Sequence, residues 1–171
     1  QRLTLIQGPP GTGKTHTAIR LLTAFVRMGR GPILATAESN VAVDNLLEGL
    51  LEMNVKAVRI GRPVKVREHL REATLDARIE QHPMQEELRF IREQNDELRR
   101  NLTGLKGKEK GLAHRDVNRN FKEIRQIEGN MISAVLDEAE VICATTIGVG
   151  HNLLGDRKFP VVLMDEATQA S

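Results

Sequence analysis

The chain has 171 residues, enough for one core and an appendage, and a formal net charge of +2 with 28% charged residues. This near-balance of charge does not by itself indicate a nucleic-acid-binding protein. The single cysteine, Cys143, excludes an intramolecular disulfide and argues against a metal–thiolate site, and its apolar surroundings predict a buried strand residue. No signal peptide or membrane-spanning stretch is visible, so we expect an intracellular protein, cytoplasmic or nuclear, without a membrane partner.

A glycine-rich string follows the first apolar run of the chain. Residues 8–15 read GPPGTGKT and match G-x-x-x-x-G-K-[ST], the phosphate-binding loop of P-loop NTPases. Apolar residues at 3–6 predict a strand that enters the loop, and the pattern at about 14–28 predicts a helix that leaves it. Glycines let successive N–H groups turn toward phosphates, and the helix N-terminus adds a positive partial charge. This order predicts a nucleoside triphosphate site and not a surface turn.

The residue types in the loop assign their roles. Lys14 is expected to reach the β- and γ-phosphates, and the Thr15 hydroxyl is expected to ligate Mg²⁺. The other expected cofactor contacts come from the loop and the start of the helix: Gly8, Pro9, Pro10, Gly11, Thr12, Gly13 and His16.

Apolar runs and helical patterns alternate beyond the first helix. Runs at 33–37 and 57–60 predict strands, and the pattern at about 41–52 predicts the helix between them. Near-continuous hydrophobicity is typical of strands covered on both faces, so the alternation predicts an α/β fold with a mostly parallel sheet. Ser39 and Asn40 stand between strand and helix, where either suits an N-cap.

Residues from about 64 to 137 depart from this pattern, because they are rich in charged and amide side chains. Two amphipathic segments joined by a stretch with glycines predict an antiparallel helical hairpin. The expected contacts along the hairpin are Leu88, Ile91, Asn95, Leu98, Leu102 and Leu105 facing Val117, Phe121, Ile124, Ile127 or Glu128, Met131 and Val135. The hairpin is either a spacer with solvated charges or an arm that touches nucleic acid or a partner through Lys106, Lys108 and Lys110.

Two final apolar runs, at 141–144 and 161–164, bring the predicted strands to five. The last run ends in Asp165 and Glu166. In P-loop enzymes a carboxylate at this place holds Mg²⁺ across from the threonine of the loop, and the neighbouring glutamate can take a proton from water. Because ligands of open α/β sheets bind at the carboxyl ends of the strands, we expect this motif and the loop to converge.

Four strings in this order resemble a known family: GPPGTGKT, ATAESNVAVDNLLEGL at 35–50, VICATTIGVG at 141–150 and VVLMDEATQA at 161–170. They are similar to motifs I, Ia, Ic and II of superfamily 1, group B helicases of the Upf-one, senataxin and immunoglobulin-mu-binding-protein type. The similarity covers nearly the whole chain, including VRIGRP at 58–63. It implies a P-loop NTPase, RecA-like domain formed by residues 1–63 and 137–171, with residues 64–136 as a helical insertion.

The resemblance also implies ATP with Mg²⁺ as cofactors and 5′→3′ movement along single-stranded RNA or DNA. Lys14, Glu166 and Gln169 would be catalytic, with Gln169 coupling the nucleotide to the track, and Thr15 and Asp165 would hold the metal. Contacts to the nucleic-acid backbone would come from Ser39, Asn40, Thr145 and Thr146. With four Phe and no Tyr or Trp, the chain offers few stacking platforms, so we expect phosphate contacts to dominate.

Some parts of the family pattern lie outside this sequence. They are the upstream glutamine motif and motifs III to VI, whose arginines belong to a second RecA-like domain of the same parent chain. We therefore interpret the sequence as part of a longer protein and expect it alone to have little or no activity. Two alternatives are an AAA-type ATPase that remodels proteins, since GPPGTGKT also occurs there, and a catalytically silent interaction module.

Overall fold

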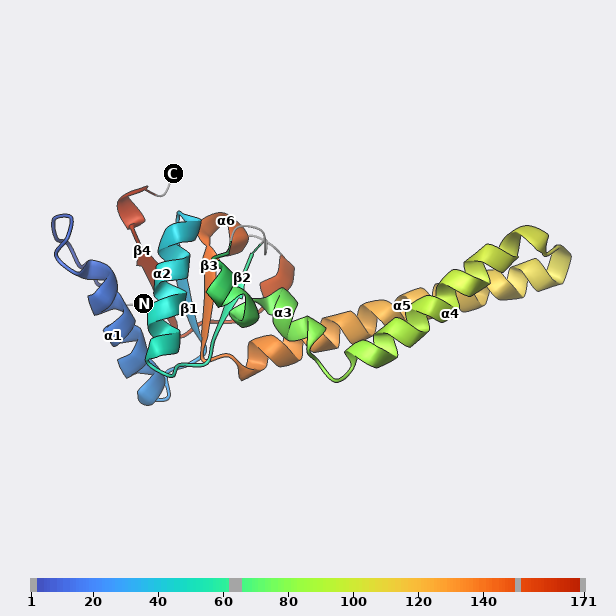
Figure 1. The fold of residues 1–171 in the computed structure, drawn as a ribbon, viewed down its shortest axis with the longest axis horizontal. Coiled ribbons are helices and arrows are strands. Elements are labelled where there is room, and N and C mark those ends of the chain that lie inside the picture. Colours follow the sequence, from blue (N-terminus) through green and yellow to red (C-terminus); the bar gives the residue numbers. More distant parts are fainter. Residues whose placement is uncertain (1–2, 62–65, 150–151, 170–171) are drawn as a thin grey trace. The chain divides into compact units, whose positions relative to one another are not determined.

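The computed structural model describes residues 3–61, 66–149 and 152–169, which form two compact units (Figure 1). The sheet unit comprises Gln1–Ala77 and Leu136–Ser171, and the hairpin unit comprises Arg78–Val135. The sheet unit extends beyond the boundary expected at residue 63, because Val66, Leu70 and Ala73 pack into its core.

A four-stranded parallel sheet forms the centre of the sheet unit, with the strand order β2-β3-β1-β4. The strands are β1 (Ile33–Ala37), β2 (Ala57–Ile60), β3 (Val141–Thr145) and β4 (Val161–Asp165). All of β1 and β2 is buried, as their near-continuous hydrophobicity predicts. The predicted α/β fold with a parallel sheet is confirmed.

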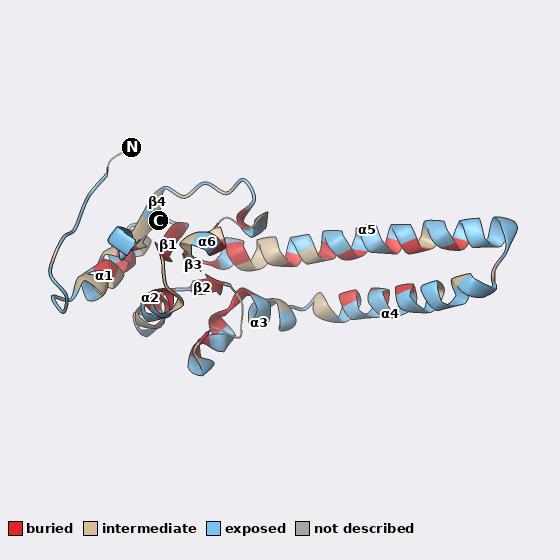
Figure 2. Cartoon of the chain, turned by 90° about the horizontal axis from the view of Figure 1, so that it is seen from above, coloured by how far each residue is buried: buried red, intermediate tan, exposed pale blue. Residues whose placement is uncertain are grey.

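Helices α1 (Lys14–Arg27) and α2 (Asn40–Glu52) pack against each other and against the sheet (Figure 1). They approach closely at Gly49, where an added Cβ would lie 2.3 Å from Ile19 Cδ1. The shorter elements of this unit are η2 (Glu68–Ala73), α6 (Thr146–Val149), η4 (Asn152–Leu154) and η5 (Ala167–Gln169), and α3 (Leu75–Glu80) begins in it. Figure 2 shows that the buried residues of α1, α2 and the strands converge in one core.

The predicted strand at residues 3–6 is wrong. These residues form no strand in the structure, and Leu3, Leu5 and Ile6 are 86%, 83% and 54% exposed. The run is as apolar as a central strand, but a strand needs neighbours to supply its hydrogen bonds. Because β1 already pairs with β3 and β4, the centre of this sheet has no place for it. The sheet of the described residues therefore has four strands and not five.

The two predicted helices are α4 (Gln85–Asn101) and α5 (Gly107–Glu138), joined through η3 (Leu102–Gly104). The hairpin unit contains all of α4 and α5 as far as Val135. Their apolar cluster consists of Leu88, Ile91, Ile124, Ile127 and Met131. On α5, Asn120 is buried. Phe121, which was expected to face the other helix, is 38% exposed and has Arg99 above its ring. The apolar type of Phe121 was thus a poor guide to its orientation.

Polar residues also take part in this helix pairing. Asn95 is buried and its Oδ1 accepts no hydrogen bond, which lowers stability as a polar residue in a heptad contact is expected to do. An ion pair between Arg92 and Glu128 joins the two helices at the surface. Lys106, Lys108 and Lys110 are exposed where the chain turns, which fits both interpretations of the hairpin.

Candidate functional site

The GPPGTGKT segment forms a loop that turns back on itself before α1 begins. Gly11 and Gly13 have φ angles of 77° and 81°, in the left-handed region where a side chain would be strained. Thr12 Oγ1 donates to the carbonyl of Pro9 at 2.8 Å, which closes the turn. Gly8 lies so near this hydroxyl that an added Cβ would be 2.8 Å from it. The glycines therefore shape the loop, as its pattern predicts.

Lys14 is the first residue of α1, and its side chain folds over the loop. Its Nζ donates to the carbonyl oxygens of Gly8 at 2.8 Å and Pro9 at 2.9 Å. These contacts hold the ammonium group within the curve of the loop, beside the N-terminus of α1. Positive charge is thus concentrated at one end of the helix, an arrangement suited to an anion.

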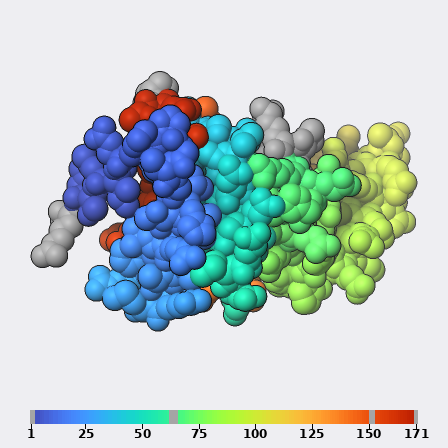
Figure 3. Space-filling view, turned by 60° about the vertical axis from the view of Figure 1, so that its left-hand side comes forward, coloured from blue at the N-terminus to red at the C-terminus, as the bar shows by residue number. Residues whose placement is uncertain are grey.

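Thr15 and Asp165 meet although 150 residues separate them in the chain. Thr15 Oγ1 donates to Asp165 Oδ2 at 2.8 Å, and Asp165 is 9% exposed at the end of β4. Figure 3 shows the red segment after β4 beside the blue atoms of the loop and α1. The structure therefore brings together the two side chains that the sequence assigns to Mg²⁺.

Glu166 continues the chain from Asp165 through an unusual backbone conformation. Its φ is 54°, which is uncommon for a residue other than glycine, and its N–H donates to Asp165 Oδ1 at 2.9 Å. This contact and the one to Thr15 engage both oxygens of the Asp165 carboxylate. Gln169 N donates to the carbonyl of Glu166 at 2.9 Å, and both side chains are exposed. The turn thus places two exposed polar side chains directly after the buried carboxylate.

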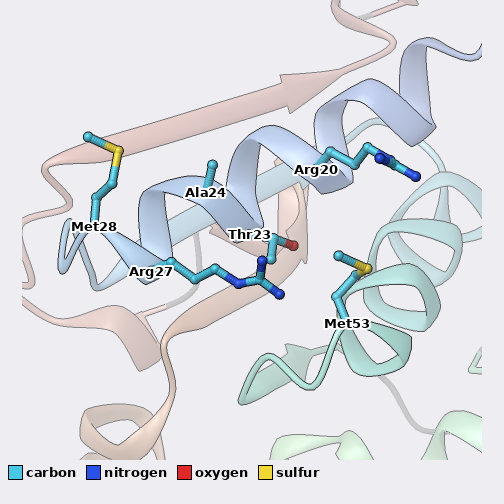
Figure 4. Close-up of a pocket in the computed structure, with 6 residues that line it drawn as sticks. All are labelled: Arg20, Thr23, Ala24, Arg27, Met28 and Met53. Carbon is cyan, nitrogen blue, oxygen red and sulfur yellow. The ribbon is translucent and has the colours of Figure 1, made fainter.

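His16 lies on the exposed side of α1, where its Nε2 accepts a hydrogen bond from Arg20 Nε at 2.9 Å. Arg20 also lines a cavity of about 430 Å³ between α1 and the end of α2 (Figure 4). The cavity is lined by Arg20, Thr23, Ala24, Arg27, Met28 and Met53. Since no residue of the loop lines it, the cavity is not the predicted nucleotide site.

The four residues expected to touch nucleic acid lie at the carboxyl ends of the neighbouring strands β1 and β3. Ser39 Oγ caps α2 by accepting from Ala42 N at 3.1 Å, and Thr145 Oγ1 accepts from Gly148 N at 3.1 Å. Thr146 Oγ1 donates to Glu38 Oε2 at 2.5 Å.

Asn40 Oδ1 accepts from Arg59 Nη2 at 2.8 Å. Each of these four side chains therefore makes a hydrogen bond within the protein through its oxygen.

Two residues that hold these side chains, Glu38 after β1 and Arg59 within β2, were not predicted from the sequence. The contact made by Glu38 could not be predicted, because its hydrogen-bond partner, Thr146, is 108 residues away in the sequence. Arg59 could have been noticed as a charged residue inside an apolar run, since a buried arginine needs acceptors. In the structure it is 1% exposed and pairs with Asp44.

Cys143 is buried in β3, as the sequence predicts, and burial raises the pKa of its thiol to about 12. Such a thiol is not a nucleophile at neutral pH. The described residues contain no cluster of three or more His, Cys, Asp and Glu side chains that could hold a metal ion. Within the same residues, no helix is long and apolar enough to cross a membrane.

The AAA domain family matches residues 1–171. ATP-dependent helicase NAM7 from Saccharomyces cerevisiae is 37% identical over 169 residues, covering 99% of this chain and 16% of that protein. DNA-binding protein SMUBP-2 from Mus musculus is 33% identical over 175 residues, covering 99% of the chain and 18% of the relative. DNA polymerase alpha-associated DNA helicase A from Schizosaccharomyces pombe is 30% identical over 171 residues, covering 99% and 26% respectively.

The chain thus spans about a quarter or less of each of these three relatives. Two of the three are named helicases, which favours a helicase over an ATPase that remodels proteins. The order of the four motifs and the parallel sheet agree with this assignment. The chain belongs to the AAA domain family and, with these relatives, to the superfamily 1 helicases of the Upf-one type.

Proposed function

We propose that the sheet unit binds ATP with Mg²⁺ at the carboxyl ends of its strands. The observation that carries this proposal is the 2.8 Å hydrogen bond between Thr15 and Asp165, because it unites the loop with the acidic motif. Hydroxyl and carboxylate oxygens fit Mg²⁺, which takes few protein ligands and keeps phosphate oxygens and waters for the rest. The loop N–H groups and Lys14 fit the phosphates.

Different residues around this site have different roles in ATP hydrolysis. Bound Mg²⁺ would neutralise negative charge that develops on the phosphates. Glu166 accepts a proton from the attacking water, and its place after Asp165 puts this base beside the metal ligand. Gln169, one short turn later, couples the state of the nucleotide to the nucleic-acid side.

The nucleic-acid track runs past the ends of β1 and β3, with contacts from Ser39, Asn40, Thr145 and Thr146. Thr146 uses its hydroxyl donor within the protein, whereas Ser39 and Thr145 only accept through their oxygens and keep an O–H donor each. The donors at these strand ends are therefore these two hydroxyls, the Asn40 amide and the N–H groups at the helix starts. N–H donors suit phosphate oxygens and do not read sequence. Binding is therefore expected to be sequence-independent and sensitive to salt.

This activity belongs to a longer, intracellular protein, cytoplasmic or nuclear, that carries the chain. Within it, the sheet unit forms the first RecA-like domain, and the hairpin unit is its insertion. A second RecA-like domain supplies the arginines that stabilise charge on the transferred phosphoryl group. Together the two domains couple ATP hydrolysis to 5′→3′ movement on single-stranded RNA or DNA.

The nucleotide part of the proposal is tested by replacing Lys14. Lys14→Ala removes a charged donor from the phosphates, so the affinity for a fluorescent ATP analogue with Mg²⁺ should fall about 10- to 100-fold. Lys158→Ala is the matched control, because this exposed lysine precedes β4 at the strand end opposite Asp165. Equal affinities for the unmodified protein and Lys14→Ala would refute the proposed nucleotide site.

A further inference from the structure

Arg59 is a charged residue enclosed in the core of the sheet unit. It lies on β2, is 1% exposed and is among the largest fully buried side chains of the described residues. Its Nε donates to Asp44 Oδ1 at 2.7 Å, and Asp44 is 2% exposed. A buried guanidinium is tolerated only with such acceptors. The ion pair with Asp44 is therefore sufficient to explain how a charged Arg59 can lie in the core.

The second acceptor of Arg59 is of a different kind. Its Nη2 donates at 2.8 Å to Oδ1 of Asn40, which is partly exposed and is the first residue of α2. The backbone also leaves room for the guanidinium, because a Cβ added at Gly61 would lie 2.5 Å from Nη1. Arg59 therefore extends from the buried Asp44 to the strand ends, where the proposed track lies.

This contact fixes which way the amide of Asn40 faces. A guanidinium only donates hydrogen bonds, so the amide oxygen must face Arg59 and the NH₂ group must face elsewhere. The described part of the chain supplies no acceptor to this NH₂ group. Asn40 thus presents N–H donors next to the start of α2, which Ser39 caps. Phosphate oxygens are suitable acceptors for such donors.

We propose that Arg59 is a positioning residue for nucleic-acid binding. It holds the Asn40 amide with its NH₂ group toward a backbone phosphate of the single strand, although Arg59 itself never touches the strand. This inference rests on the proposed function, in which Asn40 contacts the track. A fully buried residue then sets part of the strength with which the protein holds nucleic acid.

The test is a double-mutant cycle on Arg59→Lys and Asn40→Ala in the longer protein. Lysine keeps the charge for Asp44 but has no planar fork to hold a second acceptor in place. We expect each single variant to bind a labelled single-stranded oligonucleotide about 5- to 20-fold more weakly, the range for contacting residues. The double variant should bind no more weakly than Asn40→Ala, and ATP-analogue affinity should stay within about twofold.

Arg67→Lys is the matched control, because Arg67 also joins an acid and an asparagine of α2, Glu48 and Asn45, but near the surface. It should leave oligonucleotide affinity unchanged. Additive losses in the double variant would overturn the inference, and so would normal affinity in either Arg59→Lys or Asn40→Ala. Failure of the unmodified protein to bind any single strand would instead refute the proposed function.

Asn40→Asp is the alternative test variant if Arg59→Lys does not fold. Its carboxylate still accepts from Arg59 and leaves the buried ion pair intact, but it has no NH₂ donor. The melting temperature should therefore be at least that of the unmodified protein, while oligonucleotide affinity falls at least as far as in Asn40→Ala. Unchanged affinity in Asn40→Asp would overturn the inference.

Discussion

Replacing Glu166 by glutamine separates chemistry from binding at this site. The Glu166 side chain is exposed, and the ties to Asp165 and Gln169 come from its backbone N–H and carbonyl. Glutamine keeps the size and shape, so the turn and the Thr15–Asp165 contact should persist. The amide, however, cannot take a proton from water. The turnover number should fall by about 10²–10⁴, the usual contribution of a general base.

This loss corresponds to about 3–5 kcal/mol of activation free energy, whereas the affinity for ATP with Mg²⁺ should be retained. The assay compares steady-state ATP hydrolysis, with single-stranded nucleic acid present, and titration with a fluorescent ATP analogue. Glu52→Gln is the matched control, because this exposed residue ends α2 at the pole opposite Ser39. Near-normal turnover in Glu166→Gln would place the catalytic base elsewhere and refute the assignment.

Three further outcomes follow from the structure. Leu88→Ala should destabilise the hairpin unit by about 2–5 kcal/mol, because it opens a cavity beside Met131, and hydrogen exchange along α4 measures this. The raised pKa of Cys143 favours folding below about pH 9, and this stability is lost as pH rises toward 12. Cys143→Ala should therefore make the free energy of unfolding less steep with pH in that range, as urea titrations can check. The isolated chain should hydrolyse ATP about 10³–10⁵ times more slowly than the longer protein, if the arginines come from the proposed second domain. Comparable rates would contradict the proposal that a second domain supplies them.

Much of the fold could be predicted from local patterns. Strands β1 and β2 have the predicted bounds, because buried parallel strands are continuous apolar runs. The same pattern gave a wrong prediction at residues 3–6. An apolar run indicates that a segment tends to be buried, but it does not indicate whether a neighbouring strand is available to pair with it. Phe121 and Asn120 are a similar case, because the polar Asn120 is buried whereas the apolar Phe121 is 38% exposed.

The candidate site was predictable where one short string carries the chemistry. GPPGTGKT specifies its own loop, and the acidic motif could be joined to it because parallel strands end at the same edge. Contacts between distant segments were not predictable. The Glu38–Thr146 and Arg59–Asn40 hydrogen bonds depend on the strand order, which the sequence alone does not determine. These contacts show that the predicted nucleic-acid residues also serve the protein's own structure.

Directional movement of the longer protein on a single strand can be measured by streptavidin displacement. Oligonucleotides of RNA and of DNA, biotinylated at either the 3′ or the 5′ end, are incubated with the longer protein, ATP and Mg²⁺. For 5′→3′ movement we expect ATP-dependent release of streptavidin from the 3′ end of at least one of the two polymers, and loss of this release in Glu166→Gln. Release from the 5′ end only, or no release that depends on ATP, would refute 5′→3′ movement.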